Sequence, residues 1–396
     1  MGRPRAAVGA GDLQASTKEV EEGVLEIVLR ITGASLGVLV LVGAGSSVLR
    51  TTALPRGLGS RLSILIGRTL VRGAFRWIAR RLSTYEAKDR VLSFAAPVAI
   101  LAILVTWLFM FWLGYSLLLV SLTSETAREA VLEAGSSIVT LGFVGPDSGI
   151  AAAIDFAASL SGLLIIALQI AYLPVLYSAF NRREALVTLL ESRAGSPPWG
   201  PELLARHQLV AIMDSLPRFY EDWEAWAADI SESHSSYTVL LWFRSPHHDR
   251  SWITALLAVL DSAALYLALA PKRAPSQARL CLRMGFSCLR AIGDALELPY
   301  ERDPRPDDPI RLTREEFDDA IAHLEASGFP LDRTPDEAWP HFRGWRVNYE
   351  SLAYAIADLV AAPLTLWSGE RSAFDGEPPA PRRPLDRQPG SAAASH

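Results

Sequence analysis

Residues 124–147 read SETAREAVLEAGSSIVTLGFVGPD and lie between two long apolar segments. Thr126 followed by Glu129 is typical of a capping box, in which two side chains satisfy the free backbone amides at the start of a helix. This pattern predicts a short helix over residues 127–139. The six residues that follow, TLGFVG at 140–145, are predicted to leave the helix before the next apolar segment begins.

Three segments are long and apolar enough to cross a membrane, for which a helix needs about 20 residues. Residues 31–49 and 91–124 carry no charge, and residues 148–181 carry only Asp155. We therefore predict an all-α membrane protein with spans within residues 23–50, 92–121 and 149–180.

The charged flanks predict the orientation of these spans. Residues 51–90 hold nine basic and two acidic residues, whereas residues 122–148 hold one Arg and four acidic residues. Lys and Arg accumulate on the cytoplasmic side of a membrane. We expect a multi-pass protein of the inner (plasma) membrane, with the N-terminal residues 1–22 flexible and outside and the chain after residue 182 in the cytoplasm.

The segment 51–90 has a four-residue repeat of arginine. Apolar residues repeat with the same spacing two positions away, so the two sets face opposite sides of a helix. This pattern predicts an amphipathic helix in the cytoplasmic interface, with residues 61–82 on anionic lipid. The two sets are Arg68, Arg72, Arg76 and Arg80, and Leu62, Ile66, Leu70, Ala74, Ile78 and Leu82.

The order span, short helix, Thr-aliphatic-Gly-aromatic, span resembles the pore of the potassium-channel superfamily. The motif Thr140-Leu141-Gly142-Phe143 is similar to filters of two-pore-domain potassium channels, and the resemblance covers roughly residues 92–182. It implies that 140–145 is a re-entrant filter, in which backbone carbonyls from four chains replace the water around a monovalent cation, K⁺. The implied partner is the chain itself, as a homotetramer.

The resemblance also implies roles for individual filter residues. Gly142 supplies a backbone conformation that other residues resist, the Thr140 hydroxyl forms the innermost ring, and Phe143 points away from the axis. Val144 departs from the family, which has glycine there, and Gly145 comes one residue late. Either the outer filter has a one-residue insertion, or its outer rings are altered; a cation path is less affected than strict potassium selectivity.

Four residues of the third span are candidates for gating, lining the pore or packing, and three of them have two interpretations. Gly162 is a gating hinge or a packing glycine, and Gln169 lines the cavity or bonds a neighbouring helix. Pro174 is placed to kink the helix at a gate. Asp155 pairs with Arg128 or shapes the outer vestibule, because an ionisable residue in a span must face protein or water.

The chain after the third span is predicted to be a helical cytoplasmic domain over residues 183–369, followed by a disordered tail at 370–396. Its regulatory ligand is not identified by the sequence. Residues 252–270 carry only Asp261 as a charge, so they are either a buried helix, the interpretation that we favour, or a fourth span.

Composition argues against several classes of function. The net charge of −5 and the absence of a basic stripe argue against a nucleic-acid binder. Two cysteines cannot build a disulfide framework, and no metal site, cofactor site or catalytic motif is present. The sequence therefore predicts an ion channel rather than an enzyme. The alternative is a membrane-anchored sensor or scaffold with a degenerate, non-conducting pore loop.

Overall fold

The computed structural model describes residues 10–52, 65–66 and 69–370, and within these residues it is all-helical. The predictions for residues 1–9, for most of 53–68 and for the tail after residue 370 lie outside the described residues. The contacts divide the chain into two units. Unit 1 comprises residues 1–54 and 101–173, and unit 2 comprises residues 55–100 and 174–396.

Four helices are long and apolar enough to cross a membrane. Three of them, α1 (Ala10–Thr52), α5 (Ala95–Leu122) and α7 (Gly149–Ala194), correspond to the predicted spans, although α5 begins three residues later than the predicted start at residue 92. The fourth, α10 (Trp252–Leu269), has an apolar segment that is entirely buried inside unit 2. This burial accounts for the hydropathy of α10 and favours its interpretation as a core helix.

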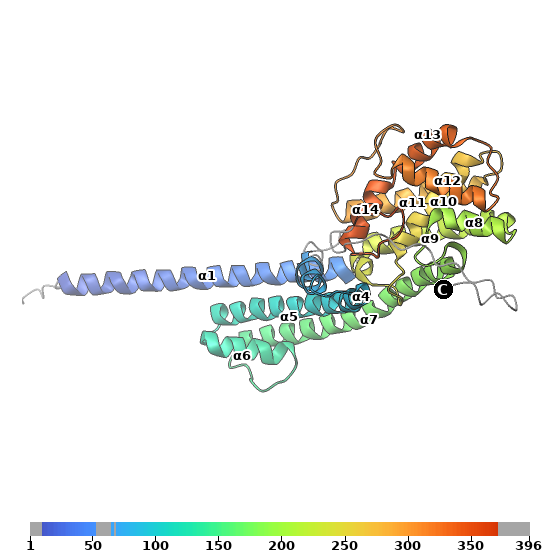
Figure 1. The fold of residues 1–396 in the computed structure, drawn as a ribbon. Helices are drawn as coiled ribbons and strands as arrows, with labels where there is room; N and C mark the ends of the chain where they lie inside the picture. Colours follow the sequence, from blue (N-terminus) through green and yellow to red (C-terminus); the bar gives the residue numbers. More distant parts are fainter. Residues whose placement is uncertain (1–9, 53–64, 67–68, 371–396) are drawn as a thin grey trace, which may run out of the picture. The chain divides into compact units, whose positions relative to one another are not determined.

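In unit 1, α1 lies against α5 through small residues (Figure 1). A Cβ added at Gly37 would be 2.9 Å from the Gly114 carbonyl oxygen, so the two backbones approach closely only because both residues are glycine. Two side-chain bonds reinforce the contact: the Trp107 indole donates to Ser47 Oγ at 3.0 Å, and Arg30 Nη1 donates to the Thr123 carbonyl at 3.3 Å. The first span is therefore an integral part of unit 1.

The described part of residues 51–90 differs from the single amphipathic helix that the arginine repeat predicts. It consists of a π-helix, η1 (Thr69–Phe75), followed by α3 (Arg76–Ala79) and α4 (Tyr85–Ser93). Arg76 is 4% exposed, and its guanidinium donates to Asp358 Oδ1 at 3.3 Å. A buried guanidinium needs a charged partner, so Arg76 faces protein rather than lipid.

Unit 2 contains the helical domain that follows the third span. Its core is α10, against which helices from all parts of the domain pack, and α9 packs along α11. A Cβ at Gly285 would be 2.3 Å from Leu260, so α10 and α11 cross closely there. The remaining helices of this domain are α8 (Gly200–Leu209), η2 (Met213–Ser215), α9 (Leu216–Ser236), η3 (Thr238–Trp242), α11 (Ser276–Ala295), α12 (Arg314–Ala326), α13 (Pro335–Arg346) and α14 (Glu350–Leu359).

Candidate functional site

The short helix between the second and third spans is α6 (Ala127–Ile138), and both of its ends are fixed by local hydrogen bonds. At its start the predicted capping box is present: the Thr126 amide donates to Glu129 Oε2 at 2.9 Å, and the Glu129 amide donates to Thr126 Oγ1 at 3.4 Å. At its end the Leu141 amide donates to the Ser136 carbonyl and the Thr140 amide to the Ser137 carbonyl, the pattern of a Schellman motif.

Thr140 occupies the left-handed position of this motif, with φ of 55°. Glycine is the usual residue there, because a side chain in this conformation costs roughly 1–2 kcal/mol. Gly142, two residues on, has φ of 67°. Thr140 and Gly142 thus have positive φ, whereas Leu141 between them does not. Such alternation allows successive peptide groups to point to the same side.

Helix α6 is held in unit 1 by the helices on either side of it in the chain. From α5, the Trp112 indole donates to the Val131 carbonyl at 2.9 Å. From α7, Ser159 Oγ donates to the Ser137 carbonyl at 2.9 Å. Tyr115 joins α5 to α7 directly, with its hydroxyl 2.7 Å from Ser161 Oγ. The three helices are thus cross-linked by polar side chains, none of which the sequence motifs single out.

The segment after α6 folds back onto that helix through Ser136. This side chain is completely buried, and its Oγ accepts hydrogen bonds from the Phe143 amide at 3.0 Å and the Val144 amide at 3.4 Å. Val144 is not among the non-glycine residues with positive φ. The backbone at Val144 therefore does not adopt the left-handed conformation that a filter glycine would supply.

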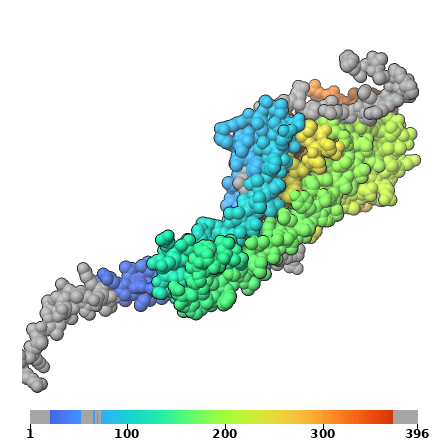
Figure 2. Space-filling model, turned by 90° about the horizontal axis from the view of Figure 1, so that it is seen from below, coloured from blue at the N-terminus to red at the C-terminus, as the bar shows by residue number. Residues whose placement is uncertain are grey.

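The predicted filter residues lie together on the surface of unit 1. Leu141 is 65% exposed and Phe143 is 62% exposed, so most of each residue is uncovered within one chain. A Cβ added at Gly142 or Gly145 would meet nothing within 4 Å. Figure 2 shows the α6 and loop region, in teal and green, uncovered on one face. These apolar side chains are without cover in a single chain.

Three of the four residues singled out on the third span, Gly162, Gln169 and Pro174, lie in α7 with different surroundings. A Cβ at Gly162 would be only 1.9 Å from the Ile138 carbonyl oxygen, which indicates a packing glycine against the end of α6. Gln169 is 6% exposed, and its Oε1 has no hydrogen-bond partner in the described residues. Pro174 lies inside the helix, at the first residue of α7 that belongs to unit 2.

An acidic cluster that the sequence does not predict lies beside α6. Glu133 is only 3% exposed, and neither its Oε1 nor Asp155 Oδ1 has a hydrogen-bond partner in the described residues. No ion pair joins Asp155 to Arg128 in the part of the chain that the structure describes. Burial, then the nearby carboxylates of Asp155 and Glu125, raise the pKa of Glu133 to about 7. Burial raises the pKa of Glu125 as well.

We expect the raised pKa of Glu133 to make unit 1 less stable as the pH rises. The ordinary value is 4.5, so the protonated side chain stabilises the folded state below that pH, and this contribution is lost as the pH rises through about 7. Glu133→Gln should remove this dependence. Thermal unfolding of the purified protein in detergent at pH 5 and pH 8 measures it.

Glu129 on the same helix is the matched control. Its hydrogen bonds with Thr126 lower its pKa, so its contribution is lost as the pH falls, the opposite sign. Glu129→Gln should leave the loss of stability between pH 5 and pH 8 in place. A midpoint that falls equally between these pH values in the wild type and in Glu133→Gln would contradict the assignment.

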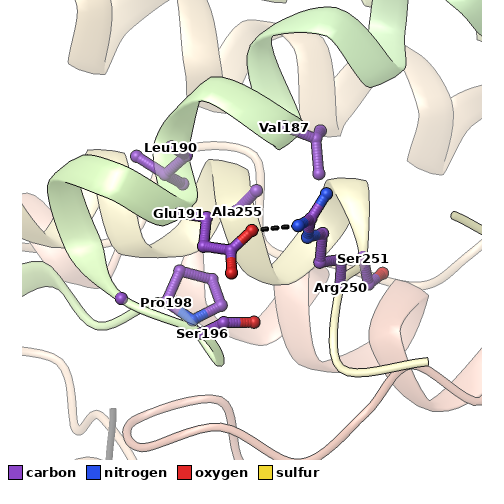
Figure 3. Close-up of a pocket in the computed structure, with 9 residues that line it drawn as sticks. Val187, Leu190, Glu191, Ser196, Pro198, Arg250, Ser251 and Ala255 are labelled. Carbon is purple, nitrogen blue, oxygen red and sulfur yellow. Dashed lines mark hydrogen bonds and ion pairs between the residues drawn. The ribbon is translucent and has the colours of Figure 1, made fainter. Parts of the chain in front are cut away.

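Elsewhere in the described residues, unit 2 has a cavity of about 670 Å³ whose lining includes Arg311, Glu316 and Tyr354. No group of three or more His, Cys, Asp or Glu side chains in the described part of the chain could hold a metal ion. Burial raises the pKa of the Cys281 and Cys288 thiols, which makes them poor nucleophiles. Figure 3 shows a cavity of about 10 Å³ at the end of α7, crossed by the Arg250–Glu191 ion pair, with room for about one water molecule.

Comparisons with known proteins leave this site to be interpreted from its own geometry. No protein-family model, no curated protein and no solved structure matches the chain. The structure therefore defines only a broad class of protein. In its described residues the chain is all-helical, with several helices long and apolar enough to cross a membrane and a helical unit that includes residues 174–370, more than half of the described residues.

Proposed function

We propose that this chain is one subunit of a tetrameric, potassium-channel-like cation channel, with residues 140–145 as its filter. The observation that carries the proposal is the loop after α6, whose backbone is tied to Ser136 while Leu141 and Phe143 stay uncovered. Non-helical backbone at membrane depth is tolerated only when protein or a water-filled cavity covers it. Further copies of the chain around a common axis would supply that cover.

The chemistry of the segment suits a cation. The C-terminal end of a helix carries a partial negative charge, and the end of α6 near Val139 lies next to the proposed filter. Backbone carbonyls of Thr140 to Gly145 would replace the hydration shell of a monovalent cation, K⁺ in the simplest case. No metal cofactor or catalytic side chain is needed, because the process is downhill conduction.

The proposal includes an orientation for the chain. The N-terminus and the α6 region would lie outside the inner (plasma) membrane, and unit 2 would lie in the cytoplasm, where it would respond to a regulatory ligand. Anionic lipid remains the proposed partner near α3. Trp77 is 57% exposed there, and the Arg81 guanidinium lies 3.5 Å above its ring, an arrangement suited to the membrane–water interface.

One observation favours a second function, a membrane-anchored sensor or scaffold. Val144 stands where the family has glycine, and its backbone is not in the left-handed conformation. In this case the α6 loop would be a structural remnant that does not conduct. Unit 2 would then bind a partner protein.

Ion flux into liposomes tests the proposal. Purified protein should carry K⁺ down its gradient, and Gly142→Asp should lower the flux by more than about tenfold, because a side chain at positive φ distorts the filter backbone. Gly149→Ala is the matched control: it lies at the start of α7 with nothing within 4 Å of its Cβ position, so its flux should be unchanged.

The two functions give different results in this assay. Equal flux of K⁺ and Na⁺, lost in Gly142→Asp, would indicate a pore with an altered outer filter. No flux together with a monomer or dimer in mild detergent would reject the channel and favour the sensor or scaffold.

A further inference from the structure

The part of α7 that belongs to unit 2 is fixed by a buried arginine. Arg183 is completely buried, and its guanidinium donates to the Leu240 carbonyl at 2.9 Å and to the Phe243 carbonyl at 2.7 Å. Glu184 Oε1 accepts from its Nε at 2.8 Å. Because bonds from a charged donor are about twice as strong as neutral ones, α7 is held firmly to the end of η3.

Three further contacts reinforce this attachment. The Trp226 indole of α9 donates to the Arg183 carbonyl at 3.0 Å. The Arg182 guanidinium bonds both carboxylate oxygens of Asp229, also on α9, at 3.0 and 3.1 Å. The Phe243 ring lies 5.6 Å from the Phe180 ring, centroid to centroid. Backbone and side chains of α7 are thus both anchored in the helical domain.

Arg244, the residue after Phe243, binds a different set of elements. Its Nε donates to Asp89 Oδ1 and its Nη2 to the Tyr85 hydroxyl, at 2.9 Å for the second bond, and both partners lie on α4. Its Nη1 donates to the carbonyls of Val360 and Ala361, just after α14, at 3.0 and 3.1 Å. The Arg244 side chain is largely buried, since only 9% of it is exposed.

The α4 helix is also packed against the helical domain. Leu92 of α4, Ala79 and Ala361 form a buried apolar cluster. Arg76 adds a bond to the Asp358 carbonyl at 3.2 Å. Since α5 begins two residues after α4 ends, the elements that Arg244 joins are the entrance to one candidate span and the C-terminal end of the helical domain.

We propose that residues 238–244 couple the helical domain to both pore helices, by fixing the base of α7 through Arg183 and the base of α4–α5 through Arg244. This inference rests on the proposed function, in which α7 is the pore-lining helix. The segment is short, and Arg183 donates to the carbonyls of Leu240 and Phe243 within it. We therefore expect residues 238–244 to move as a rigid unit. A change in the domain that shifts the segment therefore shifts both helix bases together and changes the opening between subunits.

Hydrogen exchange of the full-length protein tests the coupling, with single-channel recording as the second measurement. Arg183→Lys keeps the charge but replaces the planar guanidinium, whose separate Nη1 and Nη2 atoms reach the Leu240 and Phe243 carbonyls, with a single compact ammonium. The contacts of Arg183 in the described residues include none with α4. We nevertheless expect the amides of α4 to exchange about tenfold faster in this variant, the factor for losing one charged hydrogen bond. Arg244→Gln should likewise speed exchange at residues 182–187 of α7.

A control variant and an alternative coupling variant complete the test. Arg302→Gln removes an ion pair with Asp294 from a side chain that is 77% exposed and should change neither exchange pattern. If Arg183→Lys does not fold, Asp89→Asn tests the same link from α4, with faster exchange expected at residues 182–187. We expect the open probability to change by about fivefold or more in each folded coupling variant.

The outcomes separate this inference from the proposed function. Unchanged exchange in the distant element overturns the coupling, and so does faster exchange with unchanged open probability. If the wild-type protein carries no ions and is a monomer or dimer in mild detergent, the proposed function fails. In that case the reciprocal exchange effects alone decide whether residues 238–244 link α7 to α4.

Discussion

Replacing Gly162 with alanine should destabilise unit 1 by about 3 kcal/mol, the upper part of the usual range for overpacking a core. The added Cβ would lie 1.9 Å from the Ile138 carbonyl oxygen and 2.9 Å from the Ile138 carbonyl carbon. These are backbone atoms at the end of α6, so no rotamer change relieves the overlap. Either α6 or α7 must shift. The shift would reach Thr140, two residues after Ile138.

Thermal unfolding in detergent and ion flux in liposomes measure this effect. A large loss of thermal stability and of flux is expected for Gly162→Ala. Gly149→Ala, on the same helix, adds the same methyl group where nothing lies within 4 Å, and should stay within about 0.5 kcal/mol of the wild type. A Gly162→Ala protein with wild-type stability would show that α6 does not pack against α7 at this glycine.

Replacing Arg346 with methionine should destabilise unit 2 by about 3–5 kcal/mol, because it leaves buried carboxylates without their cation. Arg346 is completely buried. Its guanidinium pairs with Asp261 of α10 and, at 2.9 Å, with Glu350 of α14. It also donates to the Trp367 carbonyl at 2.6 Å. One side chain thus ties α13 to the central helix and to the end of the domain.

Denaturant unfolding followed by tryptophan fluorescence measures the loss. Arg302→Met is the control, because its pair with Asp294 is exposed and should contribute less than about 1 kcal/mol. Adding Asp261→Asn to Arg346→Met should recover part of the lost stability, since it removes one uncompensated charge. If the single variant at Arg346 unfolds at the same denaturant concentration as the control, the network contributes little to stability.

Local patterns in the sequence were sufficient for the elements of unit 1. The capping box at Thr126 and Glu129 depends on residues three positions apart, so it can be recognised without the fold. The long uncharged segments likewise identify α1, α5 and α7. The residues that hold the candidate site were not predicted, because Ser136, Trp112 and Ser159 act across helices and have no characteristic spacing.

Periodicity was less reliable around Arg76. A four-residue repeat predicts a face of a helix, but not what that face contacts. The described chain breaks between α3 and α4, and Asp358, almost three hundred residues away, supplies the partner that buries Arg76. The same reasoning applies to α10, whose hydropathy fits a span and whose burial is decided by its neighbours.

The sequence by itself determined that the chain is helical, that three segments can cross a membrane, and that a capped helix precedes TLGFVG. These properties follow from short-range hydrogen bonding and from hydropathy, which each segment carries alone. Only the tertiary structure decided that Gly162 is a contact with Ile138, that Glu133 is buried near other carboxylates, and that Arg183 and Arg244 meet at one segment. These depend on which residues distant in sequence come within a few ångströms of each other, and only packing sets those distances.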